Sequence, residues 1–140
     1  MADPRDIVLY TISRYAAIAG RGISRIRLMK LLFLADYIYK KRFNKKLTNA
    51  KWIMWLFGPF SKDILNVLDE LEVKGKVIIE DVDGIGIFYS TYERVRLDDE
   101  VKNIIDEVIR EYGVKSLEQL LQDVYSLREV KEAKIGDLIL

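Results

Sequence analysis

Residues 28–36 read LMKLLFLAD, and this stretch predicts where the core of the protein lies. Ser24 is a suitable N-cap for a helix that contains the stretch and runs to about Arg42. Apolar side chains occupy nearly every face of this helix, which is typical of a central helix covered on several sides. The side chains that we expect to be buried in it include Leu32, Ala35 and Ile38.

Lys30 and Asp36 alone interrupt the apolar surface within this stretch. They lie about 240° apart around the helix axis, so we do not expect them to pair with each other. Three roles are open for Lys30: its amine can extend to the surface, donate to backbone carbonyls, or bind a carboxylate of a partner.

The remaining patterns predict further helices and strands in the first part of the chain. A helix begins at Asp3-Pro4 and stops at Gly20. Residues 51–57 are bulky and aromatic and favour a strand, ended by Gly58-Pro59. Trp52 and Trp55 would face opposite sides of this strand, so one belongs to the core and the other is a candidate interface residue. Ser61 then caps a helix to Lys74.

After Gly75 the pattern changes to strands and then returns to helices. Asp83-Gly84 joins two β-branched, aromatic runs into a hairpin over residues 76–92. Asp98 or Asp99 opens a helix that ends at Gly113, and a shorter helix begins after Ser116. We therefore expect one domain over residues 1–140, α+β but mostly α, and winged-helix-like: helices, a short strand and a β-hairpin wing, with additional C-terminal helices. The tail, residues 126–140, has no clear assignment.

Composition excludes several classes of function. The 140 residues include no cysteine and no histidine, which excludes disulfides, Ser-His and Cys-His catalysis, and zinc sites built on those residues. Carboxylate pairs such as Asp98-Asp99 lie where surface carboxylates are common, and no nucleophile, base or phosphate loop accompanies them. We predict no enzymatic activity, no cofactor and no metal.

The composition also bears on location. The longest uncharged stretch in the apolar region has ten residues, Trp52–Ser61, against about 20 for a membrane-spanning helix. The charged start of the chain lacks the apolar core of a secretory signal, so a cytoplasmic protein without membrane association is expected. Two Gln, four Asn, seventeen Ile and 32% charged residues resemble the composition of proteins from hyperthermophiles.

Charge is distributed unevenly along the chain. Residues 1–62 carry a formal charge of +10 and residues 63–140 carry −9. The pattern suggests either a surface for an acidic partner or two lobes that attract each other. The candidate partner-binding or nucleic-acid-binding residues are the basic residues of segment 21–51: Arg21, Arg25, Arg27, Lys30, Lys40, Lys41, Arg42, Lys45, Lys46 and Lys51.

The helix motif LMKLLFLAD, the aromatic run WIMW at 52–55 and the FGPFS turn at 57–61 occur in an order that resembles the Panacea family, the SocA-like antitoxin domain. The resemblance covers about residues 24–90, with Phe33 where Tyr is usual. Its motif residues here are Lys30, Trp52, Gly58, Pro59 and Ser61. It implies a regulator that acts by binding, as antitoxins and proteolysis adaptors do, without enzymatic activity.

The winged layout also raises DNA binding as the alternative function. However, the polar face of the helix after Ser61 sums to −2, which suits a phosphate-lined groove poorly. The connection before that helix is also about 18 residues long, unlike a helix-turn-helix turn. We therefore rank an acidic protein partner, of toxin or protease type, first. Self-association into a homo-oligomer comes second and DNA, bound through segment 21–51, third.

Overall fold

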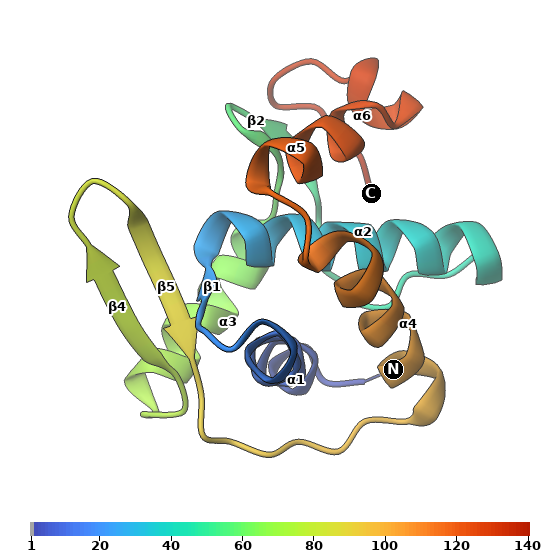
Figure 1. Ribbon diagram of the computed structural model, residues 1–140. Helices are drawn as coiled ribbons and strands as arrows, with labels where there is room; N and C mark the ends of the chain where they lie inside the picture. Colours follow the sequence, from blue (N-terminus) through green and yellow to red (C-terminus); the bar gives the residue numbers. More distant parts are fainter. Residues whose placement is uncertain (1) are drawn as a thin grey trace.

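Helix α2 (Arg25–Phe43) runs through the middle of the molecule, as Figure 1 shows for the computed structural model, which describes residues 2–140. The Ser24 hydroxyl caps it by accepting a hydrogen bond from the Arg27 backbone N–H at 3.2 Å. Helices α1 (Pro4–Ala19) and α4 (Asp99–Val108) lie on one side of α2. The opposite side is covered by α5 (Leu117–Tyr125) and by a small hairpin described below.

The other helices follow the predicted capping signals closely. Asp3 and Gly20 bound α1, Ser61 caps α3 (Lys62–Val73), and Ser116 caps α5. The predicted helix up to Gly113 is correct in extent, but its last turn, η1 (Ile109–Gly113), is π-helical. A short helix, α6 (Arg128–Lys131), lies in the tail, where the sequence pattern had no clear assignment.

The predicted hairpin is confirmed as β4 (Ile78–Val82) and β5 (Gly86–Ser90). The two strands pair antiparallel, with Ile79 opposite Tyr89. The short strand β1 (Ile23–Ser24), directly before α2, pairs with the other edge of β5, so the strand order is β1-β5-β4. The structure is therefore α+β with helices predominating, as expected.

The prediction of a single strand over residues 51–57, ended by Gly58-Pro59, is wrong. The chain forms β2 (Ile53–Trp55), turns at Leu56-Phe57 and returns as β3 (Gly58–Phe60), with Trp55 opposite Gly58. Proline lacks an N–H, which an edge strand such as β3 tolerates. The bulky residues gave a strand signal, but they extend through the turn, so their pattern did not reveal the reversal.

The C-terminal tail runs beside the free edge of β2. The Met54 N–H donates to the Asp137 carbonyl at 2.8 Å, and the Ile139 N–H donates to the Trp52 carbonyl at 2.7 Å. The Trp52 N–H in turn donates to the Leu140 carbonyl at 3.0 Å. These bonds hold the apolar end of the chain against β2, a pairing that no local pattern in the sequence indicated.

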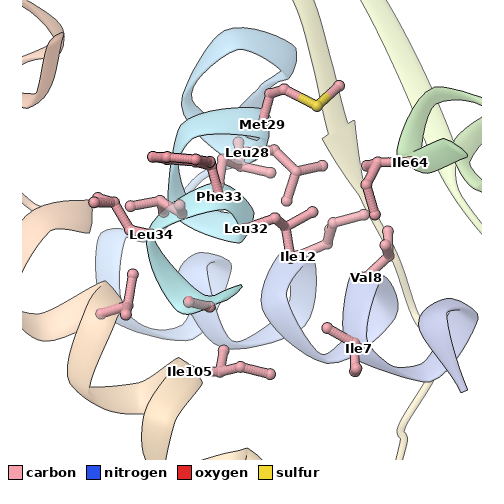
Figure 2. Close-up of a cluster of buried hydrophobic side chains, with 14 of the residues drawn as sticks. Ile7, Val8, Ile12, Leu28, Met29, Leu32, Phe33, Leu34, Ile64 and Ile105 are labelled. Carbon is pink, nitrogen blue, oxygen red and sulfur yellow. The ribbon is translucent and has the colours of Figure 1, made fainter. Parts of the chain in front are cut away.

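The hydrophobic core draws on every helix from α1 to α6. Figure 2 shows its centre, where Leu32 and Phe33 of α2 lie among side chains from α1 and α4. Leu32 and Ala35 are buried, with 3% and 2% of their surface exposed. The prediction for Ile38 is wrong in degree, because this side chain is only partly buried near the exposed end of α2.

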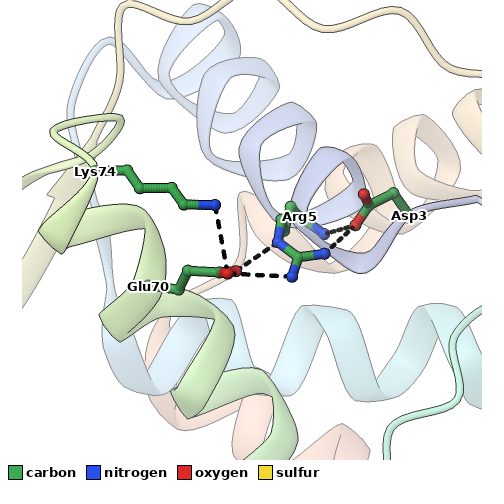
Figure 3. A network of polar contacts seen from close by, with 4 residues as sticks. All are labelled: Asp3, Arg5, Glu70 and Lys74. Atoms are coloured by element: carbon green, nitrogen blue, oxygen red, sulfur yellow. Dashed lines mark hydrogen bonds and ion pairs between the residues drawn. The ribbon is translucent and has the colours of Figure 1, made fainter.

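Ion pairs join the basic first half of the chain to its acidic second half. Arg5 of α1 pairs with Glu70 of α3, and Glu70 also forms an ion pair with Lys74 (Figure 3). Further pairs across the halves are Arg14–Asp106, Lys41–Glu129 and Arg42–Glu107. The attraction between two lobes, one of the two explanations for the charge pattern, is therefore present within the chain. Water screens the exposed pairs among these, so each of them contributes little to stability.

A substitution in α2 tests the central position of this helix. We expect Leu32→Ala to lower the free energy of unfolding by about 2–5 kcal/mol, because it leaves a cavity in an enclosed core. Ile38→Ala is the matched control and should cost less, because solvent reaches its site. The measurement is urea unfolding followed by circular dichroism, and a loss below about 1 kcal/mol for Leu32→Ala would place α2 at the periphery instead.

Candidate functional site

Asp36 is fully buried and connects α2 to the chain that leads into β2. Its Oδ1 accepts a hydrogen bond from the Thr48 backbone N–H at 2.7 Å. Its Oδ2 accepts from the Thr48 hydroxyl at 2.5 Å and from the Trp52 indole Nε1–H at 2.8 Å. Burial raises the pKa of Asp36, and the hydrogen bonds from Thr48 and Trp52 oppose this increase. The carboxylate therefore serves as a buried acceptor.

Trp52 is the residue through which several of these contacts meet. Its ring is fully buried and meets Phe33 edge-on, with the ring centroids 5.6 Å apart. Trp55, three residues later, has 47% of its surface exposed. The prediction that one of the two tryptophans lies in the core and the other at the surface is confirmed.

Lys30 makes a second contact between α2 and the β2–β3 hairpin. Its Nζ donates to the Pro59 carbonyl at 3.0 Å, so donation to a backbone carbonyl is the role that the structure shows. The side chain is buried, and burial lowers the pKa of Lys30 to about 8. Gly58 packs directly against it: a Cβ at this position, where φ is +97°, would lie 3.3 Å from Lys30 Cε.

The residues that carried the family resemblance thus have structural partners in this region. Trp52 binds Asp36, Pro59 binds Lys30, and the Ser61 hydroxyl accepts from the Ile64 N–H at 3.4 Å to begin α3. Together these contacts fix the β2–β3 hairpin on α2. Sequence reasoning did not identify Asp36 as part of this arrangement. A carboxylate on an otherwise apolar helix was the available signal, but its partners lie twelve and sixteen residues away.

An apolar groove of about 430 Å³ lies between the two hairpins and the first turns of α2. It is lined by α2 and the residue before it, by the β2–β3 hairpin and by the β4–β5 hairpin. The lining residues with large side chains are Arg25, Ile26, Met29, Lys30, Trp55, Phe57, Phe60, Ile85 and Ile87. Phe57 and Ile85, at the tips of the two hairpins, have 68% and 71% of their surface exposed.

The charges at this groove are all of one sign among the described residues that line it. Arg25 and Lys30 contribute positive charge, and no aspartate or glutamate takes part. The Arg25 Nε donates to the Tyr89 hydroxyl at 2.8 Å, and the guanidinium lies over the Tyr89 ring. The two terminal nitrogens of Arg25 form no hydrogen bond with another group of residues 2–140.

The structure does not bring the basic residues of segment 21–51 together in one place. One group lies at or before the first turns of α2: Arg21, Arg25, Arg27 and Lys30. The other group begins with Lys40 in the last turn, about 22 Å from Arg25 along the helix axis. Arg27 is buried and donates to the Gly113 and Lys115 carbonyls at 3.0 and 2.6 Å. Its contacts are therefore internal, holding the end of η1.

The basic residues at the other end of α2 are partly engaged within the chain. Lys41 and Arg42 pair with Glu129 and Glu107, and Lys46 donates to the Ala50 carbonyl. The basic side chains that remain most open to a partner are those of Lys40, Lys45 and Lys51, all of which are exposed.

Two further observations concern residues 2–140. No group of three or more carboxylates in this part of the chain is arranged to hold a metal ion. None of its helices combines the length and the apolar character that a membrane-crossing helix requires.

These features define a small α+β protein with an apolar groove on its surface. The family model described as antitoxin SocA-like, Panacea domain, matches residues 28–128, more than two thirds of the chain. The protein therefore belongs to the SocA-like Panacea antitoxin domain family. The match confirms the resemblance found over residues 24–90 and extends it through α4 and α5. No curated protein matches the chain significantly.

The Asp36 contacts make a testable contribution to stability. We expect Asp36→Ala to lower the free energy of unfolding by about 3 kcal/mol, because Thr48 and Trp52 lose the acceptor of their buried donors. Asp63→Ala is the control: Asp63 is exposed and accepts from the Lys51 N–H, so its loss should cost less than about 1 kcal/mol. Equal costs in urea unfolding would contradict a special role for Asp36.

Lys30 should make stability depend on pH in a predictable direction. Because its pKa falls from 10.5 to about 8 on folding, the charged amine opposes folding below pH 8, and this cost disappears as the pH rises through 8 to 10.5. Relative to Lys30→Met, the wild-type protein should gain up to about 3 kcal/mol between pH 7 and pH 10.5. Lys40→Met, exposed on the same helix, controls for the loss of one charge. A constant difference between wild type and Lys30→Met would contradict the prediction.

Proposed function

We propose that this protein is a non-enzymatic regulator of the antitoxin type, which acts by binding a toxin-type protein partner. The observation that carries the proposal is the family match over residues 28–128, because the SocA-like antitoxin domain suggests a regulatory role. The proposal adds that regulation occurs through protein–protein contact and includes no chemical step on a substrate.

The groove supports protein contact as the mode of action. Large apolar side chains exposed around one concave region are typical of interaction surfaces, and tryptophan is enriched among the residues that dominate binding energy. Trp55, Phe57 and Ile85 supply such side chains from two separate hairpins. Lys30 and Asp36 are buried and have shifted pKa values, and both make hydrogen bonds that join α2 to its neighbours, which agrees with a structural rather than a catalytic use.

We also propose that the chain forms a single winged-helix-like domain. The strand order β1-β5-β4, with α3 before the β4–β5 hairpin, supports that layout. DNA binding is not favoured, because α3 carries an acidic polar face and the basic residues are divided between the two ends of α2. Self-association is less favoured than the charge pattern of the sequence suggests, because ion pairs within the chain already use several of the opposed charges.

Neutralisation of a growth-arresting protein tests this function. Bacteria would carry the protein together with an inducible library of proteins from the organism that encodes it. We expect the wild-type protein to restore growth against at least one library member and to co-purify with it as a stoichiometric complex. Trp55→Ser combined with Phe57→Ser should abolish both effects while the melting temperature stays unchanged, because both side chains are exposed.

Two controls separate the proposal from its alternatives. Ile135→Ser removes an equally exposed apolar side chain in the C-terminal tail and should leave neutralisation intact. Lys45→Glu with Lys46→Glu tests the basic end of α2 and should flatten the salt dependence of any DNA affinity. The proposed function would be contradicted if the protein neutralised none of the growth-arresting proteins. Sequence-specific DNA binding at about 0.2 M salt that survives this double reversal would also contradict it.

A further inference from the structure

The groove combines an apolar lining with positive charge that no acidic side chain of its lining balances. Of its described lining residues, Arg25 and Lys30 are the charged ones, and the others are apolar apart from Ser24. Lys30 is the more constrained of the two, because only 3% of its surface is exposed. A buried ammonium group normally has a carboxylate partner, since the loss of hydration opposes an isolated charge.

The donors of both cations are only partly used within the described chain. A lysine ammonium has three N–H donors, and Lys30 directs one of them to the Pro59 carbonyl. Arg25 uses its Nε for the Tyr89 hydroxyl, which orients the planar guanidinium at the groove wall. A carboxylate entering the groove would therefore find donors that are already held in position, which is the arrangement that favours charge-assisted hydrogen bonds.

The apolar part of the groove lies around these donors. Trp55 and Phe57 border it from the β2–β3 hairpin, and Ile85 borders it from the turn of the β4–β5 hairpin. The two hairpins come from distant parts of the sequence, yet both face the first turns of α2. Only an occupant that is mostly apolar and bears an isolated negative charge complements both features.

We infer that the groove binds an apolar segment of the partner protein that carries one aspartate or glutamate, whose carboxylate pairs with Lys30 and Arg25. This inference rests on the proposed function, because it names the surface and the partner chemistry through which that function operates. The apolar side chains of the segment contact Trp55, Phe57 and Ile85. The carboxylate neutralises the buried ammonium of Lys30, so the segment is recognised by its charge as well as by its shape.

Peptide selection tests the inference without a known partner. Random 12-residue peptides displayed on phage would be selected on the wild-type protein, and the enriched peptides synthesised with a fluorescent label. We expect them to combine apolar residues with one acidic residue. Replacing that residue by its amide, Glu→Gln or Asp→Asn, should weaken binding by about 10–100-fold in fluorescence anisotropy, as for loss of a charge-assisted hydrogen bond.

Protein variants locate the carboxylate. Lys30→Met should bind the acidic peptide more weakly than wild type does and should distinguish the two peptides less, because only Arg25 remains to pair with the carboxylate. Lys40→Met, at the other end of α2, should behave as wild type. Trp55→Ser should weaken both peptides equally, because it removes apolar contact only. The comparison of the two peptides on wild-type protein needs no variant, so it stands even if Lys30→Met fails to fold.

Several results would overturn the inference. One is that no peptide is selected, and another is that affinity does not depend on the acidic residue or on Lys30→Met. Displacement of the peptides by decanoate at a lower concentration than by the free peptide would indicate a fatty-acid ligand instead. A dimer in sedimentation that Trp55→Ser dissociates would indicate a second copy of the chain. Neutralisation that survives Lys30→Met and Trp55→Ser would reject the groove and leave the proposed function standing. Carboxylate-dependent peptide binding without neutralisation of any protein would reject the proposed function and leave the groove standing as a binding site.

Discussion

The structure depends on the burial of the Asp36 carboxylate in α2. A carboxylate with no exposed surface requires hydrogen-bond donors, and the chain supplies them from Thr48 and Trp52. Because Thr48 and Trp52 donate to Asp36, the segment after α2 runs back along this helix, and Trp52 packs against Phe33. The position of Trp52 then fixes β2, which in turn pairs with β3 on one edge and with the C-terminal tail on the other. The interaction costs solvation, but it specifies one arrangement of segments that hydrophobic contact alone would leave less defined.

Lys30 extends the same principle at a position six residues, or about 1.7 turns, earlier in α2. Its bond to the Pro59 carbonyl requires the hairpin to approach closely, and Gly58 permits this approach because it has no side chain. The two buried charges therefore fix two ends of one segment, Trp52 and Pro59, against one helix. The outcome is that the turn between them, with Trp55 and Phe57, projects outward beside the β4–β5 hairpin. The groove is a consequence of how the hairpin is held.

Several of the opposed charges of the two halves of the chain pair with each other within the molecule. Arg5, Arg14, Lys41 and Arg42 each meet an acidic residue from the second half. The sequence therefore overstated the basic surface available to a partner, because charge counted along the chain does not record which charges are paired in space. The groove has only two positive charges in its lining, those of Arg25 and Lys30. Lys30 is buried, and a charge among apolar side chains has a stronger effect than a charge at an exposed surface.

Elements whose signals are local could be predicted from the sequence. The caps at Asp3, Ser24, Ser61 and Ser116, the turn at Asp83-Gly84 and the all-round apolar character of α2 depend on neighbours within a few residues, and each was predicted. The motif of α2 and the FGPFS turn also pointed to the correct family. Tertiary structure alone decided the reversal at Leu56-Phe57, the pairing of the tail with β2, the partners of Asp36 and Lys30, and the separation of the basic residues. Each of these features depends on contacts between segments distant in sequence. The energies of such contacts depend on burial and on the hydrogen-bond donors nearby, and the hydrophobic periodicity of the sequence indicates neither.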